Sequence, residues 1–247
     1  MALAIINKSI LKVSGEKAHS LLDGLTTQDM NKISLDNPIY TLFLNNKGRV
    51  LFNSIIYKLA ENEYALEIEP ELLMELAKHL HKFDMEKSVE FGQEELAVAV
   101  SNEKLEGFYS DPRSEKLPYR GFIATDAKSD EEFLNEYENL RLELAIPDNN
   151  DFIREKSLAN DLNTEELNGV SFTKGCYLGQ EITSKTKHIR QTKNQLVCLD
   201  NTTLKAKNDQ ELFDLEDNKL GKTFSYNSKF VLAIIKRGSD TKNIKIK

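Results

Sequence analysis

The amino-acid sequence predicts an α+β fold that ends in a β-rich tail. Three observations carry this prediction. Two β-rich runs flank a tight turn at residues 45–48, amphipathic helical periods occupy residues 70–83 and 130–145, and only short strand-like runs follow residue 195. With 247 residues, the chain is long enough for a sizeable core in one large domain or in two to three small lobes.

The first 60 residues predict a short strand pair, a helix and a hairpin. Ser14 is the expected N-cap of the helix, and Glu16 is an acid in its first turn, where the helix dipole favours one. The stretch IYTLFLNNKGRVLFNSIIYKL follows. Residues 45–48 in it, Asn-Asn-Lys-Gly, tolerate the positive φ of a tight turn, so we expect the two flanking runs to pair as a hairpin.

Two longer helices and a tail of strands follow. Residues 70–83 repeat apolar side chains with a helical period, begin with Pro70 in the first turn, and precede the strand-like run ELAVAV. Residues 130–145 carry acids in the first turn and end before Pro147. After residue 195 the runs NQLVCLD, KLGKTFSYN and FVLAIIKR predict a small all-β lobe.

Composition excludes several classes of protein. The chain has 40 Asp and Glu against 33 Lys and Arg, a net charge of -7, so it lacks the overall positive field of a general nucleic-acid binder. No apolar run approaches the roughly 20 residues of a membrane span. Two cysteines 22 positions apart form neither a disulfide framework nor a four-ligand zinc site. We therefore expect a soluble cytoplasmic protein in a reducing compartment.

The histidines offer no metal site. His79 and His81 are two positions apart in a predicted helix, so their side chains point about 200° apart and cannot share a metal ion there. Neither a Ser-His-Asp motif nor a glycine-rich phosphate loop is legible. We expect no resident metal and no resident cluster.

The segment FTKGCYLGQE, residues 172–181, concentrates chemistry around one cysteine. Two glycines allow a sharp turn or a close backbone approach, and their neighbours offer a cation, a thiol, an amide and a carboxylate. The residues of interest are Lys174, Gly175, Cys176, Tyr177, Gly179, Gln180 and Glu181. If a helix follows, its N-terminus and Lys174 favour the Cys176 thiolate. The alternative is a buried cysteine packed as a small apolar group, which is the role expected of Cys198.

This segment resembles the signature of the YgfZ/GcvT family of folate-binding proteins. The resemblance is to the YgfZ-type branch, which includes the mitochondrial iron–sulfur assembly homologue. Four further stretches resemble family blocks in the family's order: LLDGLTTQDM, TLFLNNKGRVLFNSIIY, DPRSEKLPYRGF and the long stretch from YENLRLELAIP to LNGVSFTKGCYLGQEIT. The resemblance covers most of residues 1–195.

The resemblance implies a fold and a site. The fold is a three-lobed α+β trefoil around a central folate cavity, with two intertwined lobes in residues 1–195, divided near residues 100–110, and a C-terminal β-barrel in residues 196–247. Tetrahydrofolate or a derivative is the implied cofactor, and Cys176 is the reactive thiol near it. The residues expected to line the folate site are Thr27, Gln28, Asp29, Lys47 and Arg49.

Two departures from the family pattern bear on function. The T-proteins of the wider family use a catalytic Asp in an Asn-containing motif near the first long helix, and YALEIEPELLMELAKHL shows no such motif. This argues against aminomethyl transfer. The signature also continues, in the family, into a basic segment with an Arg-Gly pair, where this chain has Ile189 and Arg190.

Three hypotheses for the function stay open. The preferred one is a folate-binding protein that supports assembly or repair of iron–sulfur clusters in client enzymes, with those enzymes or assembly proteins as partners and a monomeric chain. The second is a folate-dependent one-carbon transferase with Asp29 or Glu181 as general base. The third is a non-enzymatic adaptor with a vestigial cavity, in which Lys174, Gln180 and Glu181 make internal hydrogen bonds.

Overall fold

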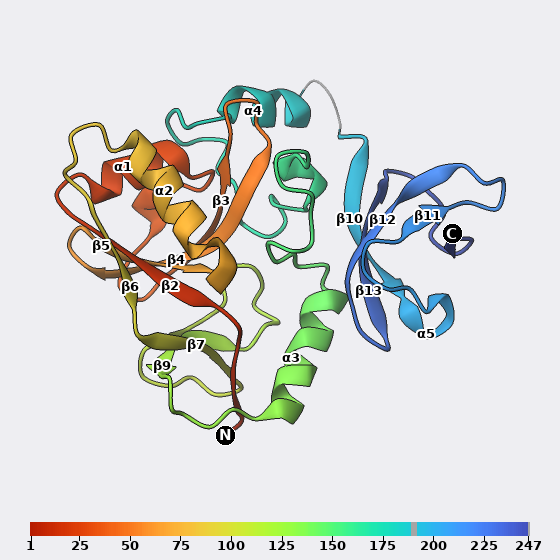
Figure 1. Cartoon of the computed structure of the whole chain (residues 1–247), viewed down its shortest axis with the longest axis horizontal. Helices are drawn as coiled ribbons and strands as arrows, with labels where there is room; N and C mark the ends of the chain where they lie inside the picture. The colour runs from red at the N-terminus through yellow and green to blue at the C-terminus, as the bar shows by residue number, and fades with distance from the viewer. Residues whose placement is uncertain (189–191, 247) are drawn as a thin grey trace.

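The computed structural model describes residues 1–188 and 192–246. Within these residues, fourteen strands form three antiparallel sheets. Figure 1 shows the first two sheets in one body and the third sheet beside it, beyond helix α3. Ile189 and Arg190, where the sequence departs from the family signature, lie outside the described residues.

The first sheet has five strands in the order β3-β4-β5-β2-β6. The strands are β2 (Ser9–Ser14), β3 (Ile39–Leu44), β4 (Val50–Ala60), β5 (Glu63–Ile68) and β6 (Glu90–Glu94). Helices α1 (Ala18–Leu25) and α2 (Leu73–Phe83) pack on one face, where Leu22 and Leu76 are fully buried. Short 3-10 turns, η1 (Met30–Lys32) and η2 (Pro70–Leu72), lead out of α1 and into α2.

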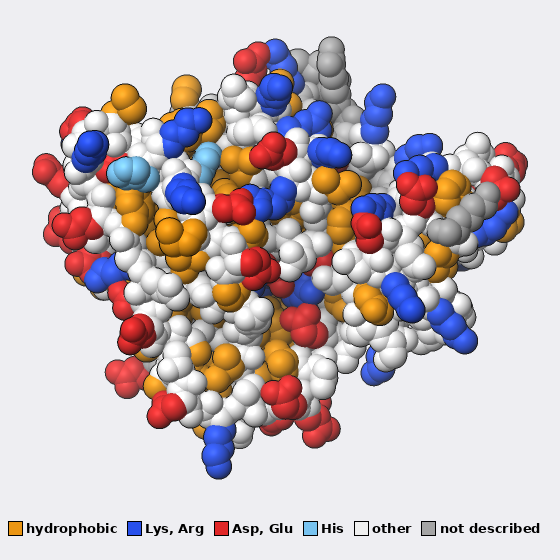
Figure 2. Space-filling model, in the orientation of Figure 1, with side chains coloured by type: hydrophobic (Ala, Val, Ile, Leu, Met, Phe, Trp, Pro, Cys, Tyr) orange, Lys and Arg blue, Asp and Glu red, His pale blue; other side chains and the backbone are white. Residues whose placement is uncertain are grey.

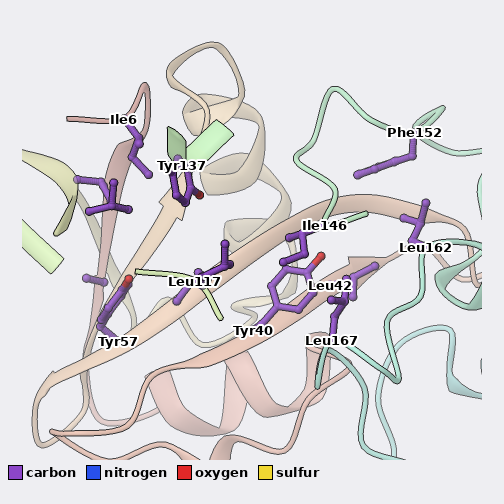
Figure 3. Packing of buried hydrophobic residues seen from close by; sticks show 14 of the residues in the cluster. Ile6, Tyr40, Leu42, Tyr57, Leu117, Tyr137, Ile146, Phe152, Leu162 and Leu167 are labelled. Carbon is purple, nitrogen blue, oxygen red and sulfur yellow. The ribbon is translucent and has the colours of Figure 1, made fainter. Parts of the chain in front are cut away.

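The other face of this sheet packs toward the second sheet, whose order is β1-β7-β9-β8. Its strands are β1 (Leu3–Ile5), β7 (Leu96–Ser101), β8 (Phe108–Tyr109) and β9 (Tyr119–Ala124), and α3 (Glu131–Glu143) lies against it. Figure 3 shows part of the shared core, with Tyr40 and Leu42 beside Ile146 and Leu167. Residues 100–110, near which the lobe boundary was expected, include the end of β7 and all of β8, so this range lies within the second sheet.

The third sheet has the order β10-β13-β12-β11-β14. Its elements are β10 (Asn194–Asp200), the short helix α5 (Asn201–Leu204), β11 (Glu211–Phe213), β12 (Lys219–Tyr226), β13 (Phe230–Lys236) and β14 (Lys245–Ile246). A closed barrel requires its two outer strands to pair. In the part of the chain that the structure describes, β10 and β14 do not pair, so the expected C-terminal β-barrel is here an open sheet.

The local predictions from sequence are confirmed in most elements. The hairpin forms as β3 and β4, the helical period of residues 70–83 forms η2 and α2, and the second period forms α3, whose N-cap Asp130 accepts hydrogen bonds from the first turn. The start of the first helix was predicted wrongly. Ser14 ends β2, and α1 begins only at Ala18.

The reason for the later start lies in Gly15. Its φ is +132°, and a Cβ there would lie 2.3 Å from the carbonyl oxygen of Ser88, so the chain must turn sharply before a helix can begin. Ser14 is meanwhile held in the sheet by pairing with Glu63 and Glu90. Sheet pairing therefore overrides the N-cap preference of this serine.

Buried ion pairs tie the three sheets together. Arg120 of β9 pairs with Glu67 of β5 at 2.9 Å, which joins the two N-terminal sheets. Arg141 of α3 pairs with Asp151 at 2.8 Å, and Asp151 also accepts a hydrogen bond of 3.0 Å from the backbone N–H of Ser225 in β12. Separating the members of a buried ion pair leaves an uncompensated charge, which is costly. These contacts therefore favour one arrangement of the sheets.

Among the described helices, none combines the length and the apolar character that crossing a bilayer requires. The longest of them, α3, has 13 residues, or about 20 Å at 1.5 Å per residue.

Candidate functional site

The cysteine segment forms an arch over the end of α1. At its first foot, the Lys174 ammonium donates hydrogen bonds to the carbonyl oxygens of Asp23 at 2.6 Å, Thr26 at 3.0 Å and Gln28 at 3.1 Å. It also pairs with the Asp23 carboxylate at 2.9 Å. The lysine side chain is only 1% exposed, and this burial lowers its pKa, against the opposing effect of Asp23. Lys174 therefore anchors the loop in the interior of the protein.

The second foot of the arch lies at residues 177 and 178. The backbone N–H of Leu178 donates to the carbonyl oxygen of Gly24 at 3.0 Å, next to the carbonyl that Lys174 binds. Tyr177 packs in the core between the two N-terminal sheets, and burial raises its pKa to about 12. Leu178 packs in the other core, beneath α1 and α2. Consecutive side chains thus enter two different cores.

Cys176 lies between these two feet and is exposed. Its neighbour Gly175 faces open space, since no heavy atom lies within 4 Å of a Cβ built there. Cys198 differs, because it is half-buried in β10 and burial, aided by Glu143 and Asp200, raises its pKa to about 11. The arch therefore presents one accessible thiol from a backbone that is fixed on both sides.

The arch continues into helix α4 (Gln180–His188) through a contact with the β3–β4 turn. Gly179 has a φ of +85°, and a Cβ there would lie 2.8 Å from the carbonyl oxygen of Asn45 and 3.1 Å from the Cα of Gly48. Gly48 has a φ of +65°, and a Cβ there would lie 2.6 Å from that of Ile182. Only glycine fits at both positions without displacing the backbone.

The remaining polar residues of the segment make local contacts. The Gln180 side-chain amide donates to the carbonyl oxygen of Gly175 at 3.3 Å and so closes the arch. Glu181 is exposed and pairs with Lys185 one turn along α4 at 2.5 Å; this hydrogen bond lowers its pKa. Lys174 and Gln180 therefore support the loop, and Glu181 lies outside it.

The expected folate residues at the end of α1 are used inside the protein. Thr27 is fully buried; its hydroxyl donates to the carbonyl oxygen of Gly169 at 2.6 Å and accepts from the backbone N–H of Leu42 at 2.9 Å. The Gln28 amide, 5% exposed, donates to the carbonyl oxygen of Asn168 at 2.5 Å. These polar atoms tie the arch region to β3.

The other three expected residues are closer to the surface. Asp29 caps η1 by accepting from the backbone N–H of Asn31 at 2.9 Å, which lowers the Asp29 pKa. Lys47 is exposed in the β3–β4 turn. Arg49 donates to the carbonyl oxygen of Lys156 at 2.5 Å. Lys47 and Arg49 flank the glycine that contacts Gly179, whereas Thr27, Gln28 and Asp29 lie at the other foot of the arch.

The arrangement does not fit a folate held by these five residues. Thr27 and Gln28 have their polar atoms engaged in buried internal hydrogen bonds, and a ligand would have to break them. None of the five lines the hollow of about 390 Å³ between α1 and the end of α2, or the one of about 270 Å³ beneath α4. We derive no chemical step through a folate from this set.

Asp23 was not recognised from the sequence, although it is the counter-ion of Lys174. The contact between the β3–β4 turn and α4 was missed as well. A signal for it existed, since Gly48 and Gly179 each belong to a stretch that resembles a family block. Nothing in the spacing of the two stretches shows that they touch.

Comparison with known proteins places this geometry in context. No protein-family model matches the chain. The mitochondrial iron-sulfur cluster assembly factor IBA57 of Mus musculus is 30% identical over 220 residues, which cover 73% of this chain and 61% of that protein. The mitochondrial IBA57 homolog of Coccidioides immitis is 28% identical over 224 residues, covering 74% of this chain and 53% of that protein.

A solved structure shows the fold. The glycine cleavage system aminomethyltransferase T from Bartonella henselae superposes with a TM-score of 0.72 over 95% of this chain and 78% of that chain, at 17% sequence identity. The chain therefore has the aminomethyltransferase T fold, also called GcvT-like. Together with the IBA57 relatives, this likeness supports the family resemblance, at the level of the wider family rather than of its YgfZ-type branch.

Two facts limit what carries over from the relatives. The chain spans between half and about three fifths of the length of the IBA57 proteins that it matches. These relatives are named mitochondrial, which contradicts the cytoplasmic location expected from the sequence. That expectation was wrong because net charge, few cysteines and short apolar runs indicate a reducing compartment and do not distinguish the cytoplasm from others.

Proposed function

We propose that this chain supports the assembly or repair of iron–sulfur clusters in client enzymes and that Cys176 is its reactive thiol. The relatives named iron-sulfur cluster assembly factors support the process, and the shared fold supports the comparison over most of the chain. The partners are client enzymes or other assembly proteins, and the chain acts as a monomer.

One observation carries the role of Cys176. The thiol is exposed, whereas Lys174, Tyr177 and Leu178 around it are anchored in the interior. A cysteine that serves only as a small apolar group is expected to be buried. A thiol held in one place at the surface is accessible to a sulfur atom or metal centre of a partner, and a fixed backbone lowers the entropy lost on contact.

The rival hypotheses are less well supported. An adaptor with a purely structural turn explains the internal hydrogen bonds of Lys174 and Gln180, but it gives no role to an exposed thiol. A transferase needs a general base directed at its substrate. Asp29 caps a turn and Glu181 pairs with Lys185, so neither carboxylate is placed for that task.

Tetrahydrofolate or a derivative remains part of the proposal. Its support is the aminomethyltransferase T fold, and the three-lobed arrangement around a central cavity is proposed with it. The contacts would differ from those expected, since Thr27 and Gln28 are engaged elsewhere. A ligand that binds only the folded chain raises its stability by about 2.7 kcal/mol at a hundredfold excess over Kd. If millimolar tetrahydrofolate does not shift the thermal midpoint of unfolding, the folate part of the proposal is wrong.

Complementation tests the main proposal. A strain that lacks its own factor of this type is assayed for the activities of several iron–sulfur enzymes, with the wild-type chain, Cys176→Ala or Cys198→Ala supplied. We expect the wild type and Cys198→Ala to restore the activities and Cys176→Ala to fail at equal protein abundance. Full restoration by Cys176→Ala would refute the role of this thiol and favour the adaptor.

A further inference from the structure

The two segments that meet at Gly48 and Gly179 are basic in an acidic protein. Residues 37–60 and 167–199 together contain eight of the 33 Lys and Arg and one of the 40 Asp and Glu. The two segments therefore carry a net charge of about +7, and the remaining residues carry about -14, by the formal charges of the side chains. Four of these cations, Lys47, Arg49, Lys185 and Lys187, belong to the β3–β4 turn and to α4, which are in contact.

Part of this charge lies at the surface of the β3–β4 turn and of α4, where Lys47 and Lys185 are exposed and Arg49 and Lys187 are half-buried. We define the basic face as these four residues together with the exposed Lys156, whose carbonyl oxygen accepts a hydrogen bond from Arg49. Figure 2 shows more Lys and Arg than acidic side chains along the upper edge, where Figure 1 places α4. The turn and α4 are in direct contact at Gly48 and Ile182, so charges from both segments share one surface.

Some of these charges have acidic partners. Lys185 pairs with Glu181, and Lys187 pairs with Glu165 and also lies 4.2 Å from the centre of the Phe172 ring. Each of these two ion pairs is neutral as a whole when seen from a distance. The excess of positive charge on this face therefore comes from Lys47, Arg49 and Lys156, for which no ion pair is found in the part of the chain that the structure describes.

The basic face lies within electrostatic reach of Cys176. Cys176 and Gly179 are three residues apart, so their Cα atoms are separated by at most about 11 Å. Gly179 touches the turn that carries Lys47. The Debye length is about 8 Å at physiological ionic strength and about 30 Å at 0.01 M, so the field at the thiol is felt strongly at low salt.

We propose that the basic face is the docking surface for an acidic protein, and that it steers a cysteine-bearing segment of that protein to Cys176. The proposal rests on the proposed function, of which it specifies the partner. Charge complementarity speeds encounter and selects partners of opposite sign. A nucleic acid is disfavoured, because the strongly acidic remainder of the chain repels a long polyanion whereas a compact acidic patch contacts only this face.

Two short peptides test this inference without a client enzyme. Both carry one cysteine as a mixed disulfide with 2-thiopyridine, and they differ only in having four Glu or four Lys around it. The Cys176 thiolate attacks the peptide sulfur, a new disulfide forms, and pyridine-2-thiolate leaves with the electron pair and takes up a proton to give pyridine-2-thione. Its absorbance gives the rate. The full chain is used as Cys198→Ala, so that only Cys176 reacts.

We expect the acidic peptide to react about tenfold faster than the basic one at about 0.02 M salt, because each unit charge pair near 10 Å changes the rate about twofold. The ratio should fall toward one at 0.5 M salt. Lys47→Glu and Lys185→Glu should each lower it at low salt, and Glu181→Gln should raise it. The control is Lys128→Glu, because Lys128 is exposed in the loop between β9 and α3, and Figure 1 shows this loop at the edge of the molecule opposite to α4. This variant should leave the ratio unchanged.

Equal rates for the two peptides at low salt would overturn the inference. An equal decrease of the ratio of the two rates in Lys47→Glu and in Lys128→Glu would also overturn it. Binding of a fluorescent oligonucleotide that Lys47→Glu abolishes, without any preference between the peptides, would assign the face to nucleic acid instead. Failure of complementation by Cys176→Ala would stand independently of these rates, so the two proposals fail separately.

Discussion

Gly48 and Gly179 face each other where the β3–β4 turn meets the start of α4. A Cβ on Gly179 would lie 3.1 Å from the Cα of Gly48, and a Cβ on Gly48 would lie 3.2 Å from the carbonyl oxygen of Gly179. Both residues have positive φ. The cysteine arch is therefore placed by a backbone contact that no side chain can enter.

This contact makes Gly179 sensitive to substitution. Gly179→Ala should destabilise the chain by about 2 kcal/mol or more, because alanine is strained at a φ of +85° and its Cβ would lie 2.8 Å from the carbonyl oxygen of Asn45. Gly175→Ala is the matched control, since its Cβ meets open space. Urea unfolding of both variants measures the difference. Equal free energies of unfolding for Gly179→Ala and Gly175→Ala would show that the turn accommodates a Cβ at position 179 without cost.

The buried lysine of the arch supports a second prediction. Lys174→Met should cost about 3 kcal/mol, because it leaves the Asp23 carboxylate without its counter-ion and removes a hydrogen-bond donor from three carbonyl oxygens, of which only that of Gln28 keeps a side-chain donor, the Thr26 hydroxyl. The value is at the lower end for buried pairs, as Asp23 is 27% exposed. In a double-mutant cycle, Asp23→Asn should cost much less in the Lys174→Met background than alone. Additive losses would mean that the two side chains are not coupled.

The sequence predicted the elements of this site better than their arrangement. The β3–β4 hairpin and the helical period of α2 were readable, because turn residues and apolar spacing act over a few positions. The contact of Gly48 with Ile182 joins residues 134 positions apart, and the ion pair of Lys174 with Asp23 joins residues 151 positions apart. No local pattern encodes such contacts.

The role of Lys174 shows the same limit. Its position two residues before Cys176 suggested a cation that favours the thiolate. The structure directs its ammonium to backbone carbonyls of α1 and to Asp23. Lys174 is close to Cys176 in the sequence, but its ammonium binds these other groups. The orientation of a side chain depends on the hydrogen-bond acceptors around it, and only the tertiary fold determines which acceptors those are.

The two cysteines should differ in reactivity. Iodoacetamide at pH 7 should label Cys176 at least tenfold faster than Cys198, because Cys176 is exposed while Cys198 is half-buried with a pKa raised to about 11. Mass spectrometry of timed samples gives both rates. Cys176→Ala should change the free energy of unfolding by less than about 1 kcal/mol, since little buried area is lost. Faster labelling of Cys198 would place the accessible thiol elsewhere.

Histidine 79 should make the stability depend on pH. Its ring lies among Phe43, Phe52 and Phe83, and burial lowers the pKa of His79, with Lys82 adding to the effect. The unfolded chain binds a proton at this histidine near the ordinary pKa of about 6.5, whereas the folded chain binds it only at lower pH. The stability that this difference supplies is present above about pH 6.5 and is lost as the pH falls below it.

Replacing this histidine should remove that dependence. His79→Leu places an apolar side chain of similar volume among the three rings, and leucine cannot take up a proton. The free energy of unfolding of the variant, measured by urea between pH 7.5 and 5, should therefore fall less than that of the wild type. His81→Leu is the control, because His81 is exposed two positions further along α2. If both variants follow the wild-type curve, protonation of His79 does not limit stability in acid.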